Sequence, residues 1–218
     1  MRLYLIRHGQ TDWNRDLRVM GVGPIPLNEH GRHAVGELAR FLARDGIPMI
    51  FTSTVDRARE SAEILAGTWG AEVREEPDFN ESAYERWVGK TYGELAGDPE
   101  FDLYTRSPSR SSFSGTEGMA DIQRRALAAV RRIVDGAASP NGGYKRAAAV
   151  SHSDVIKPVI AHYLGMDLDD MHRLSISNAS ASVIDFTDAA KPRIRYINLT
   201  PWKWRERCGS QVANSKWS

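Results

Sequence analysis

Histidine and arginine residues occur at the ends of several apolar runs in this sequence. Arg7 and His8 close the first run, Arg57 follows the second, and His152 closes a later one. A neutral histidine has a ring nitrogen with a free lone pair and can attack phosphorus. Arginine binds phosphate oxygens in a bidentate manner. If the fold brings these residues together, they would form a site for an anion and for phosphoryl chemistry.

Each of these residues also has a simpler interpretation. His8 could lie in a surface turn, and Arg57 could be solvated and paired with Asp56 or Glu60 of its own helix. Arg57 is expected in the first helical turn, however, where free N–H groups already attract anions and an arginine opposes the helix dipole. Two imidazoles and two guanidiniums at one point would be unfavourable without an anion. A bound anion explains both features.

Strands and helices are predicted to alternate along the chain. Apolar, β-prone runs predict strands at 2–7, 48–52, 71–74, 147–151, 181–186 and 194–199. Helical patterns run from a capping Asn28 to about Arg44, from a capping Ser53 to near Gly67, over 119–134, and from a capping Ser153 to Gly165. The alternation predicts an α/β layered fold with a mostly parallel central sheet. Ligands of such sheets bind beyond the carboxyl ends of the strands.

The composition is that of an ordinary globular protein. Of the 218 residues, 41% are hydrophobic and 26% charged, and the formal net charge is +1. This balance gives no broad attraction to nucleic acid or acidic membranes, so neither is expected as a partner. No run has the length of a signal peptide or membrane span, and the single cysteine, Cys208, fits a reducing cytoplasm. We expect a single domain over 1–200 and a C-terminal tail over 201–218.

The segment 97–118 is rich in serine, proline, glycine and aspartate and has weak periodicity. It predicts a short helix and a long loop, and long loops in compact domains are often lids or binding loops. Arg106 and Arg110 of this segment could meet an anionic substrate or could simply be solvated. Selectivity is expected from this segment and from side chains near Trp13, Met20, Val22 and Arg86.

Three motifs resemble those of the histidine phosphatase superfamily, which includes the cofactor-dependent phosphoglycerate mutases. "LIRHGQTDWN" resembles the family signature, "STVDRARESAEI" its second motif, and "VSHSDVI" its late histidine motif. The resemblance covers roughly residues 1–200, in the family's order. It implies a phosphoglycerate mutase-like fold, a three-layer α/β/α sandwich.

The resemblance also implies catalytic roles. His8 would be the nucleophile that forms a phosphohistidine, and Arg7, Arg57 and His152 would clamp the phosphoryl oxygens. No metal and no cofactor is implied, because the arginines would supply the electrostatic stabilisation. Asn14, Gly9 and Ser153 are the expected substrate-binding residues.

The general acid is expected in the stretch "PDFNESAYERWVGKTYGEL". The resemblance favours Glu81, on alignment to Gly89, over the competing Glu85. A protonated carboxyl group would donate to the leaving oxygen and then act as a base toward water.

Three functions remain open, and the sequence favours a phosphatase for a small phosphorylated metabolite. Phosphoglycerate mutases of the family usually follow the acid with Arg-His-Tyr, whereas this chain has Ser82, Ala83 and Tyr84. The alternatives are a cofactor-dependent phosphoglycerate mutase and a non-catalytic protein that binds phosphorylated ligands. Sugar phosphates, phosphoserine, nucleotide monoesters, a ribazole phosphate and phosphoproteins all remain candidate substrates. A homodimer is compatible with the family.

The remaining polar candidates are assigned no catalytic role. His30 and His33 have a spacing that can hold zinc, but a solvated helix face is expected because no third ligand is evident. His162 and His172 are expected to be structural or surface residues. Asn178 could line the site or belong to a turn.

Overall fold

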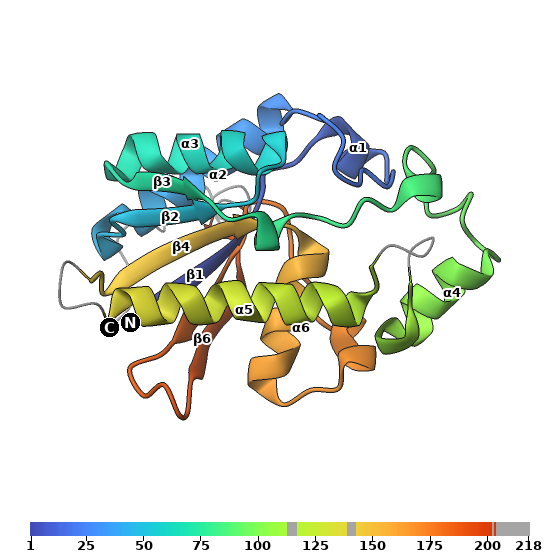
Figure 1. The fold of residues 1–218 in the computed structure, drawn as a ribbon. Helices are drawn as coiled ribbons and strands as arrows, with labels where there is room; N and C mark the ends of the chain where they lie inside the picture. Colours follow the sequence, from blue (N-terminus) through green and yellow to red (C-terminus); the bar gives the residue numbers. More distant parts are fainter. Residues whose placement is uncertain (113–116, 139–142, 202, 204–218) are drawn as a thin grey trace.

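The protein folds around one six-stranded sheet (Figure 1). The computed structural model describes residues 1–112, 117–138, 143–201 and 203. Its strands are β1 (Arg2–Arg7), β2 (Met49–Thr52), β3 (Glu72–Glu75), β4 (Arg146–Ser151), β5 (Ala181–Asp185) and β6 (Arg193–Leu199). Its α-helices are α1 (Asp12–Arg15), α2 (Glu29–Leu42), α3 (Asp56–Trp69), α4 (Pro99–Arg106), α5 (Met119–Ala137) and α6 (Ser153–Leu164). Each predicted strand is found, with ends that differ by at most one residue.

The strand order is β3-β2-β4-β1-β5-β6. The four strands from β3 to β1 are mutually parallel, whereas β5 runs antiparallel to β1, and β6 antiparallel to β5. The prediction of a mostly parallel sheet is therefore confirmed. Because parallel strands share their carboxyl edge, the residues that follow β1, β2 and β4 lie side by side.

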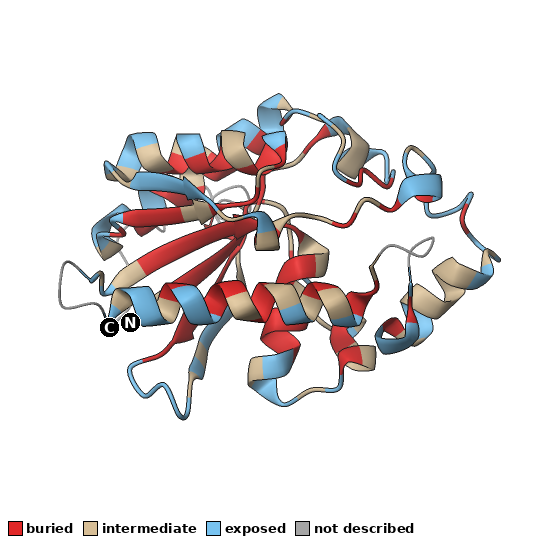
Figure 2. Ribbon diagram, viewed as in Figure 1, coloured by how far each residue is buried: buried red, intermediate tan, exposed pale blue. Residues whose placement is uncertain are grey.

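Helices cover both faces of the sheet, as the three-layer prediction requires. Helices α2 and α3 lie on one face, and α5 and α6 on the other (Figure 1). Strand β1 shows why: Leu3 and Leu5 join the core under α5 and α6, whereas Tyr4 and Ile6 join the core under α2 and α3. Successive side chains of a strand point to opposite faces, so a strand buried on both faces is apolar throughout. Figure 2 shows this buried centre in red.

Two of the predicted helix caps were wrong. Helix α3 has Val55 as its N-cap and runs past Gly67 to Trp69, where Gly70 ends it with a left-handed backbone conformation. Helix α6 is preceded by His152 at the N-cap, so Ser153 is its first residue rather than its cap. The hydroxyl of Ser53 instead donates to Asn80 Oδ1 and lies 2.9 Å from His152 Nε2. The Ser53 hydroxyl, which the local sequence predicts to cap a helix, therefore contacts residues that are distant in the chain.

The segment 97–112 forms a short helix, α4, and a 3₁₀ turn (Pro108–Arg110). Asp98 caps α4, and Pro99 occupies its first turn, where proline is tolerated. Phe101 and Tyr104 pack against the core on the α5/α6 side. The helix lies beyond the carboxyl edge of the sheet (Figure 1). Its proposed role as a lid stays a prediction.

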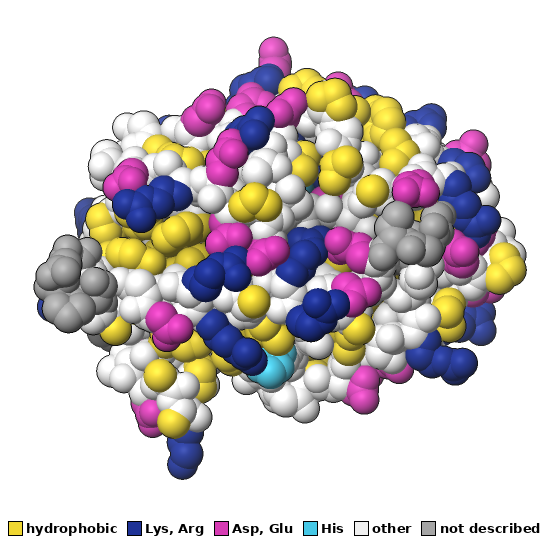
Figure 3. Space-filling view, in the orientation of Figure 1, with side chains coloured by type: hydrophobic (Ala, Val, Ile, Leu, Met, Phe, Trp, Pro, Cys, Tyr) yellow, Lys and Arg dark blue, Asp and Glu magenta, His cyan; other side chains and the backbone are white. Residues whose placement is uncertain are grey.

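The surface in Figure 3 carries acidic and basic side chains interspersed with one another. None of the helices in the described part of the chain has the length and apolarity needed to cross a bilayer. Of the predicted tail, only Pro201 and Lys203 are described, so the rest, with Cys208, lies outside the described residues. The domain division at residue 200 stays a prediction.

Candidate active site

Histidines that follow two neighbouring strands meet at the carboxyl edge of the sheet. Strands β1 and β4 pair in parallel, with Arg7 opposite Ser151. His8 comes directly after β1 and His152 directly after β4, and their ring centroids are 5.2 Å apart. Both residues are buried, with 1% and 0% of their surface exposed.

The tautomer of His8 is determined by the backbone carbonyl of the next residue, Gly9. Its Nδ1 lies 2.7 Å from the carbonyl oxygen of Gly9, and a carbonyl can only accept, so Nδ1 carries the hydrogen. Burial, together with the charges of Arg57 and Arg7, holds the pKa of His8 well below its usual value. His8 is therefore neutral near pH 7, and its Nε2 presents a lone pair.

Arg57 comes from the first turn of α3 and lies fully buried beside His8. Its Nε donates to His8 Nε2 at 3.2 Å, and one Nη donates to the carbonyl of Gly21 at 2.7 Å. Burial lowers its pKa to about 10, so the guanidinium stays charged at neutral pH. Gly21 has a φ of +55°, and a Cβ there would lie 2.2 Å from the carbonyl oxygen of Ala83.

The buried cluster contains polar nitrogens that the protein leaves unpartnered. Within the described part of the chain, Arg7 Nε, one Nη of Arg57 and His152 Nδ1 have no hydrogen-bond partner. An unpaired buried donor costs about 1–3 kcal/mol. The two arginine nitrogens are donors, and their position at one strand edge indicates a ligand that accepts several hydrogen bonds, as a phosphoryl group does.

Of the other expected site residues, three line the main cavity and one does not. Arg7, Asn14 and Ser153 line the main cavity. Asn14 Oδ1 accepts hydrogen bonds from Thr11 and Asn178. Gly9 does not line the cavity, and its N–H donates to Ser61 Oγ.

Asn178 also donates to the carbonyl of His8. It therefore joins two segments that carry site residues, but it lies in a turn and does not line the main cavity; it borders a smaller cavity together with Arg7 and Gln10. The sequence left this choice open.

Glu81 lies in the cavity, next to His152. Its Oε2 is 3.9 Å from His152 Nδ1, and its side chain is only 10% exposed. Burial and the neighbouring Asp154 carboxylate raise the pKa of Glu81 to about 7, against the opposing effect of Arg57. The competing Glu85 is exposed and does not line the cavity.

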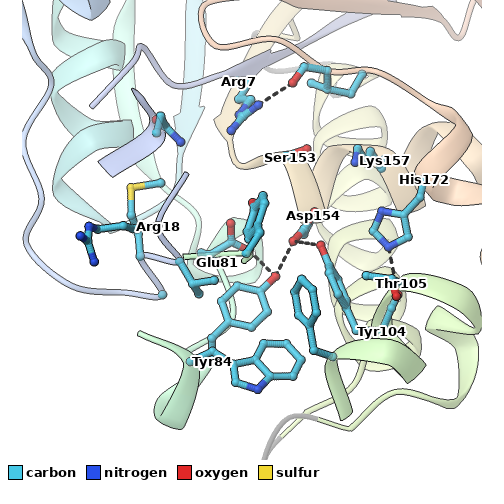
Figure 4. A pocket seen from close by; sticks show the side chains of 18 of the residues that line it. Arg7, Arg18, Glu81, Tyr84, Tyr104, Thr105, Ser153, Asp154, Lys157 and His172 are labelled. Atoms are coloured by element: carbon cyan, nitrogen blue, oxygen red, sulfur yellow. Dashed lines mark hydrogen bonds between the residues drawn. The ribbon is translucent and has the colours of Figure 1, made fainter. Parts of the chain in front are cut away.

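The cavity has a volume of about 490 Å³ and is lined by His8 and Arg7. From Arg7 it extends toward Tyr104 of α4 and Lys157 of α6 (Figure 4). Its aromatic wall consists of Tyr84, Trp87, Tyr92, Phe101 and Tyr104. A polar side consists of Ser153, Asp154, Lys157, His172, Arg173 and Ser175.

Several of these lining residues were missed in the sequence. Asp154 lies in the late histidine motif and Lys157 follows it on the same helix, and this spacing could have identified them. His172 was expected to be structural or at the surface, yet it lines the cavity, where Nε2 contacts the carbonyl of Tyr104. Of the side chains tied to selectivity, Met20 lines the cavity, whereas Trp13, Val22 and Arg86 do not. Arg106 and Arg110 also lie outside the lining.

The described residues contain no group of three or more His, Cys, Asp or Glu side chains suited to a metal ion. His30 and His33 are exposed on α2.

Comparison with known proteins identifies relatives along nearly the whole chain. A bifunctional protein of Mycobacterium tuberculosis is 32% identical over 203 residues, which cover 91% of this chain and 54% of the relative. This chain thus spans about half the length of the first curated relatives it matches. A Cronobacter sakazakii protein named "Probable phosphoglycerate mutase GpmB" is 29% identical over 189 residues, with 85% of both chains covered.

Solved structures have the same fold. YhfR of Bacillus stearothermophilus matches with a TM-score of 0.80 and 31% identity, covering 89% of this chain and 95% of the other. A mycobacterial glucosyl-3-phosphoglycerate phosphatase in complex with VO3 matches with a TM-score of 0.79 and 26% identity, covering 91% and 98%. The family model of the histidine phosphatase superfamily (branch 1) matches residues 3–200. The chain belongs to the histidine phosphatase superfamily.

Proposed function

We propose that the protein is a phosphomonoester hydrolase in which His8 is the nucleophile. The observation that carries this proposal is the neutral His8, whose Nε2 lone pair faces the buried nitrogens of Arg57 and His152. In the first step, Nε2 attacks phosphorus and forms an N–P bond while the ester P–O bond breaks. The shift of Arg57 Nε from His8 to a phosphoryl oxygen frees the lone pair for this attack.

The cationic cluster stabilises the transferring group. Arg7 and Arg57 donate to the equatorial oxygens, where negative charge is spread in the transition state. Arg7 Nε and one Nη of Arg57 have no hydrogen-bond partner among the described residues, so they are available to the phosphoryl oxygens. Apart from the shift of Arg57 Nε away from His8, little rearrangement of these side chains is needed when the phosphoryl group arrives.

Glu81 handles the proton in both steps. With a pKa of about 7 it is about half protonated at neutral pH, and in its protonated form it gives its proton to the leaving alkoxide. The resulting carboxylate then takes a proton from water, which attacks phosphorus and breaks the N–P bond. Inorganic phosphate leaves and His8 is regenerated.

The substrate in this proposal is a small phosphorylated metabolite. A cavity of about 490 Å³ accommodates a molecule of that size. Lys157 stands on its polar side without an ion pair to the described residues, and a carboxylate on the substrate would complement it. The similarity to a glucosyl-3-phosphoglycerate phosphatase, whose named substrate carries a carboxylate, supports this direction.

A phosphoglycerate mutase is the second candidate, because a relative bears that name at 29% identity. A mutase must return the phosphoryl group to an organic acceptor rather than to water. Ser82 and Ala83 stand where mutases of the family carry arginine and histidine, so the residues after Glu81 favour hydrolysis. A cytoplasmic location and a homodimer are parts of the proposal that rest on the sequence alone.

The test is a panel of phosphomonoesters scored by release of inorganic phosphate, with His8→Ala as the control. We expect hydrolysis by the natural sequence and loss of at least about 10³-fold in His8→Ala. Interconversion of phosphoglycerates in the presence of bisphosphoglycerate, without phosphate release, would instead identify a mutase. Ligand binding with no turnover of any ester would identify a non-catalytic binding protein.

A further inference from the structure

Asp154 is a partly buried carboxylate for which the mechanism above has no use. It lies in the first turn of α6, two residues after His152. Its Oδ2 accepts hydrogen bonds from the hydroxyl groups of Tyr84, at 2.6 Å, and Tyr104, at 2.8 Å (Figure 4). The carboxylate therefore joins α6 to the loop after Glu81 and to α4.

The hydroxyl of Tyr84 bridges Asp154 and Glu81. Its oxygen is 2.6 Å from Asp154 Oδ2 and 3.4 Å from Glu81 Oε1. A phenol has one hydrogen, and the shorter, charge-assisted contact takes it. Toward Glu81, Tyr84 thus presents an oxygen lone pair, and that contact is attractive only when Glu81 carries a proton.

The negative charge of Asp154 raises the pKa of Glu81, as the Tyr84 bridge does. Two carboxylates that share one buried site cannot both ionise at ordinary pH, so one pKa rises. Burial alone would raise the pKa of Asp154, but Lys157 and the hydrogen bonds from Tyr84 and Tyr104 outweigh burial and lower it. Asp154 is therefore the member of the pair that stays ionised, and Glu81 is the member that keeps a proton.

The positive groups that face Glu81 are engaged elsewhere. Arg57, from α3, is directed at His8 and Gly21. Arg125, from α5, is bonded to Glu117 and to the carbonyl of Asp78. They lower the pKa of Glu81 but do not cancel burial and Asp154.

The remaining titratable groups around Glu81 are neutral or distant from its oxygens. Burial keeps His152 neutral, since it lowers the pKa of that histidine well below its usual value. Burial likewise raises the pKa values of Tyr84, Tyr92 and Tyr104. Arg7, on β1, donates to the carbonyl of Ile176.

We propose that Asp154 is a positioning residue that, through the hydroxyl of Tyr84, holds Glu81 in its protonated, proton-donating form. The proposal rests on the proposed function in one respect, namely that Glu81 is the general acid. Asp154 itself does not exchange protons with the substrate. Its negative charge and its hold on the Tyr84 hydrogen make the acid available at neutral pH.

The direct test follows the titration of Glu81 by NMR of protein labelled with ¹³C at the glutamate carboxyl carbon. The Glu81 signal is assigned by its absence from Glu81→Gln. In the natural sequence its midpoint should lie near neutrality, and in Asp154→Asn it should fall by about one pH unit or more. Asp135→Asn, on the exposed side of α5, makes the same charge change away from the cavity and should leave the midpoint unchanged.

Tyr84→Phe provides an independent variant, because it removes the bridge and keeps the Asp154 charge. The Glu81 midpoint should fall here as well, because the acceptor for its proton is lost. An unchanged midpoint in folded Asp154→Asn would overturn the proposal, and an unchanged or raised midpoint in Tyr84→Phe would overturn the bridging role of the tyrosine. This titration needs no turnover, so it remains decisive even if the protein proves not to be a phosphatase.

Kinetics supply the functional readout. For an alkyl phosphomonoester such as glycerol 3-phosphate, the alkaline fall of kcat/KM should move to lower pH in Asp154→Asn by the same interval as the NMR midpoint. For p-nitrophenyl phosphate, whose leaving group needs no proton, the change should be much smaller. A uniform loss with both esters and an unmoved pH limb would mean that Asp154 only supports the fold.

Discussion

The residues at the strand edge concentrate positive charge that the protein itself does not neutralise. In the described part of the chain, neither Arg7 nor Arg57 forms an ion pair. Burying a charge without a partner is costly, so this arrangement is consistent with a site that an anion completes. His8, placed against the same nitrogens, remains neutral because protonation would add another positive charge.

At the residue scale, the raised pKa of Glu81 predicts a pH limit. A general acid works only while protonated, so kcat/KM for alkyl phosphomonoesters should fall as pH rises through about 7. Glu81→Gln should lose about 10²–10⁴-fold with an alkyl ester and far less with p-nitrophenyl phosphate. Steady-state kinetics from pH 5 to 9 measure both effects.

The matched control for Glu81→Gln is Glu85→Gln, which removes an exposed carboxylate four residues further along the chain. It should leave the profile unchanged. A wild-type profile that stays level to about pH 9 would show that another group donates the proton.

Secondary-structure elements contribute to the site through the faces they present. Helix α6 places Ser153, Asp154 and Lys157 along the cavity. Positions three and four residues apart lie on one helical face. Helix α4 contributes Phe101 and Tyr104 to the opposite wall. The substrate beyond its phosphoryl group would thus lie between these two helices.

At the element scale, Lys157→Met should impair substrates that carry a carboxylate. Methionine keeps an unbranched side chain but lacks the charge, so KM should rise about tenfold for such substrates, which corresponds to roughly 1.4 kcal/mol. KM for p-nitrophenyl phosphate should stay the same. Lys191→Met, in the exposed turn between β5 and β6, is the control. Equal effects on all substrates would argue against a carboxylate contact.

The loop that carries Gly21 should be sensitive to a single added methyl group. Gly21→Ala combines a φ of +55° with a Cβ 2.2 Å from the carbonyl oxygen of Ala83. Gly46→Ala, at a φ of +58° with nothing within 4 Å, bears only the conformational cost. The free energy of unfolding should fall by more than about 1 kcal/mol in Gly21→Ala, and by less in Gly46→Ala.

Urea unfolding of both variants measures this difference, and kcat/KM measures its consequence for the site. Activity should fall in Gly21→Ala alone, because the Gly21 carbonyl holds Arg57. Equal destabilisation by the two substitutions would mean that the loop yields to the added methyl group.

The free energy of unfolding of the whole molecule should decrease as the pH falls below about 6.5, while the carboxylates of the surface ion pairs are still ionised. His8 and His152 have pKa values far below the usual 6.5, chiefly because of burial. The unfolded chain therefore takes up protons below about pH 6.5 that the folded protein does not, and stability falls as pH falls. Glu81 acts oppositely, since the folded protein holds its proton between the usual pKa of 4.5 and about 7. Two imidazoles outweigh this one carboxyl group.

Thermal unfolding in phosphate-free buffer should show a Tm that decreases from pH 7 to pH 5. The decrease should be steeper in Glu81→Gln, which lacks the opposing contribution, and inorganic phosphate should raise the Tm because it pairs the buried cations. A Tm that is constant over this interval would indicate that His8 and His152 remain free to take up protons in the folded protein.

The sequence by itself determined the strands, their parallel arrangement and the ends at which His8 and His152 occur. Apolar runs buried on both faces of a sheet leave a strong local pattern, and parallel strands necessarily share one carboxyl edge. The alternation of strands and helices also predicted a layered sandwich, but the structure showed which helices cover each face. The proposed general acid, Glu81, needed the additional information in the family motif, because a carboxylate in a loop has no periodic signal.

Only the tertiary structure decided the surroundings of that acid. Tyr84, Tyr104 and Asp154 are separated by up to 70 residues in the chain and meet at one carboxylate oxygen. The hydroxyl of Ser53 likewise contacts Asn80 and His152 rather than capping a helix. Contacts of this kind arise when packed elements place side chains that are distant in sequence a few ångströms apart. The sequence around each of these residues does not indicate which residue it will contact. The proton affinity of Glu81, which depends on burial and on those partners, is for this reason a property of the fold.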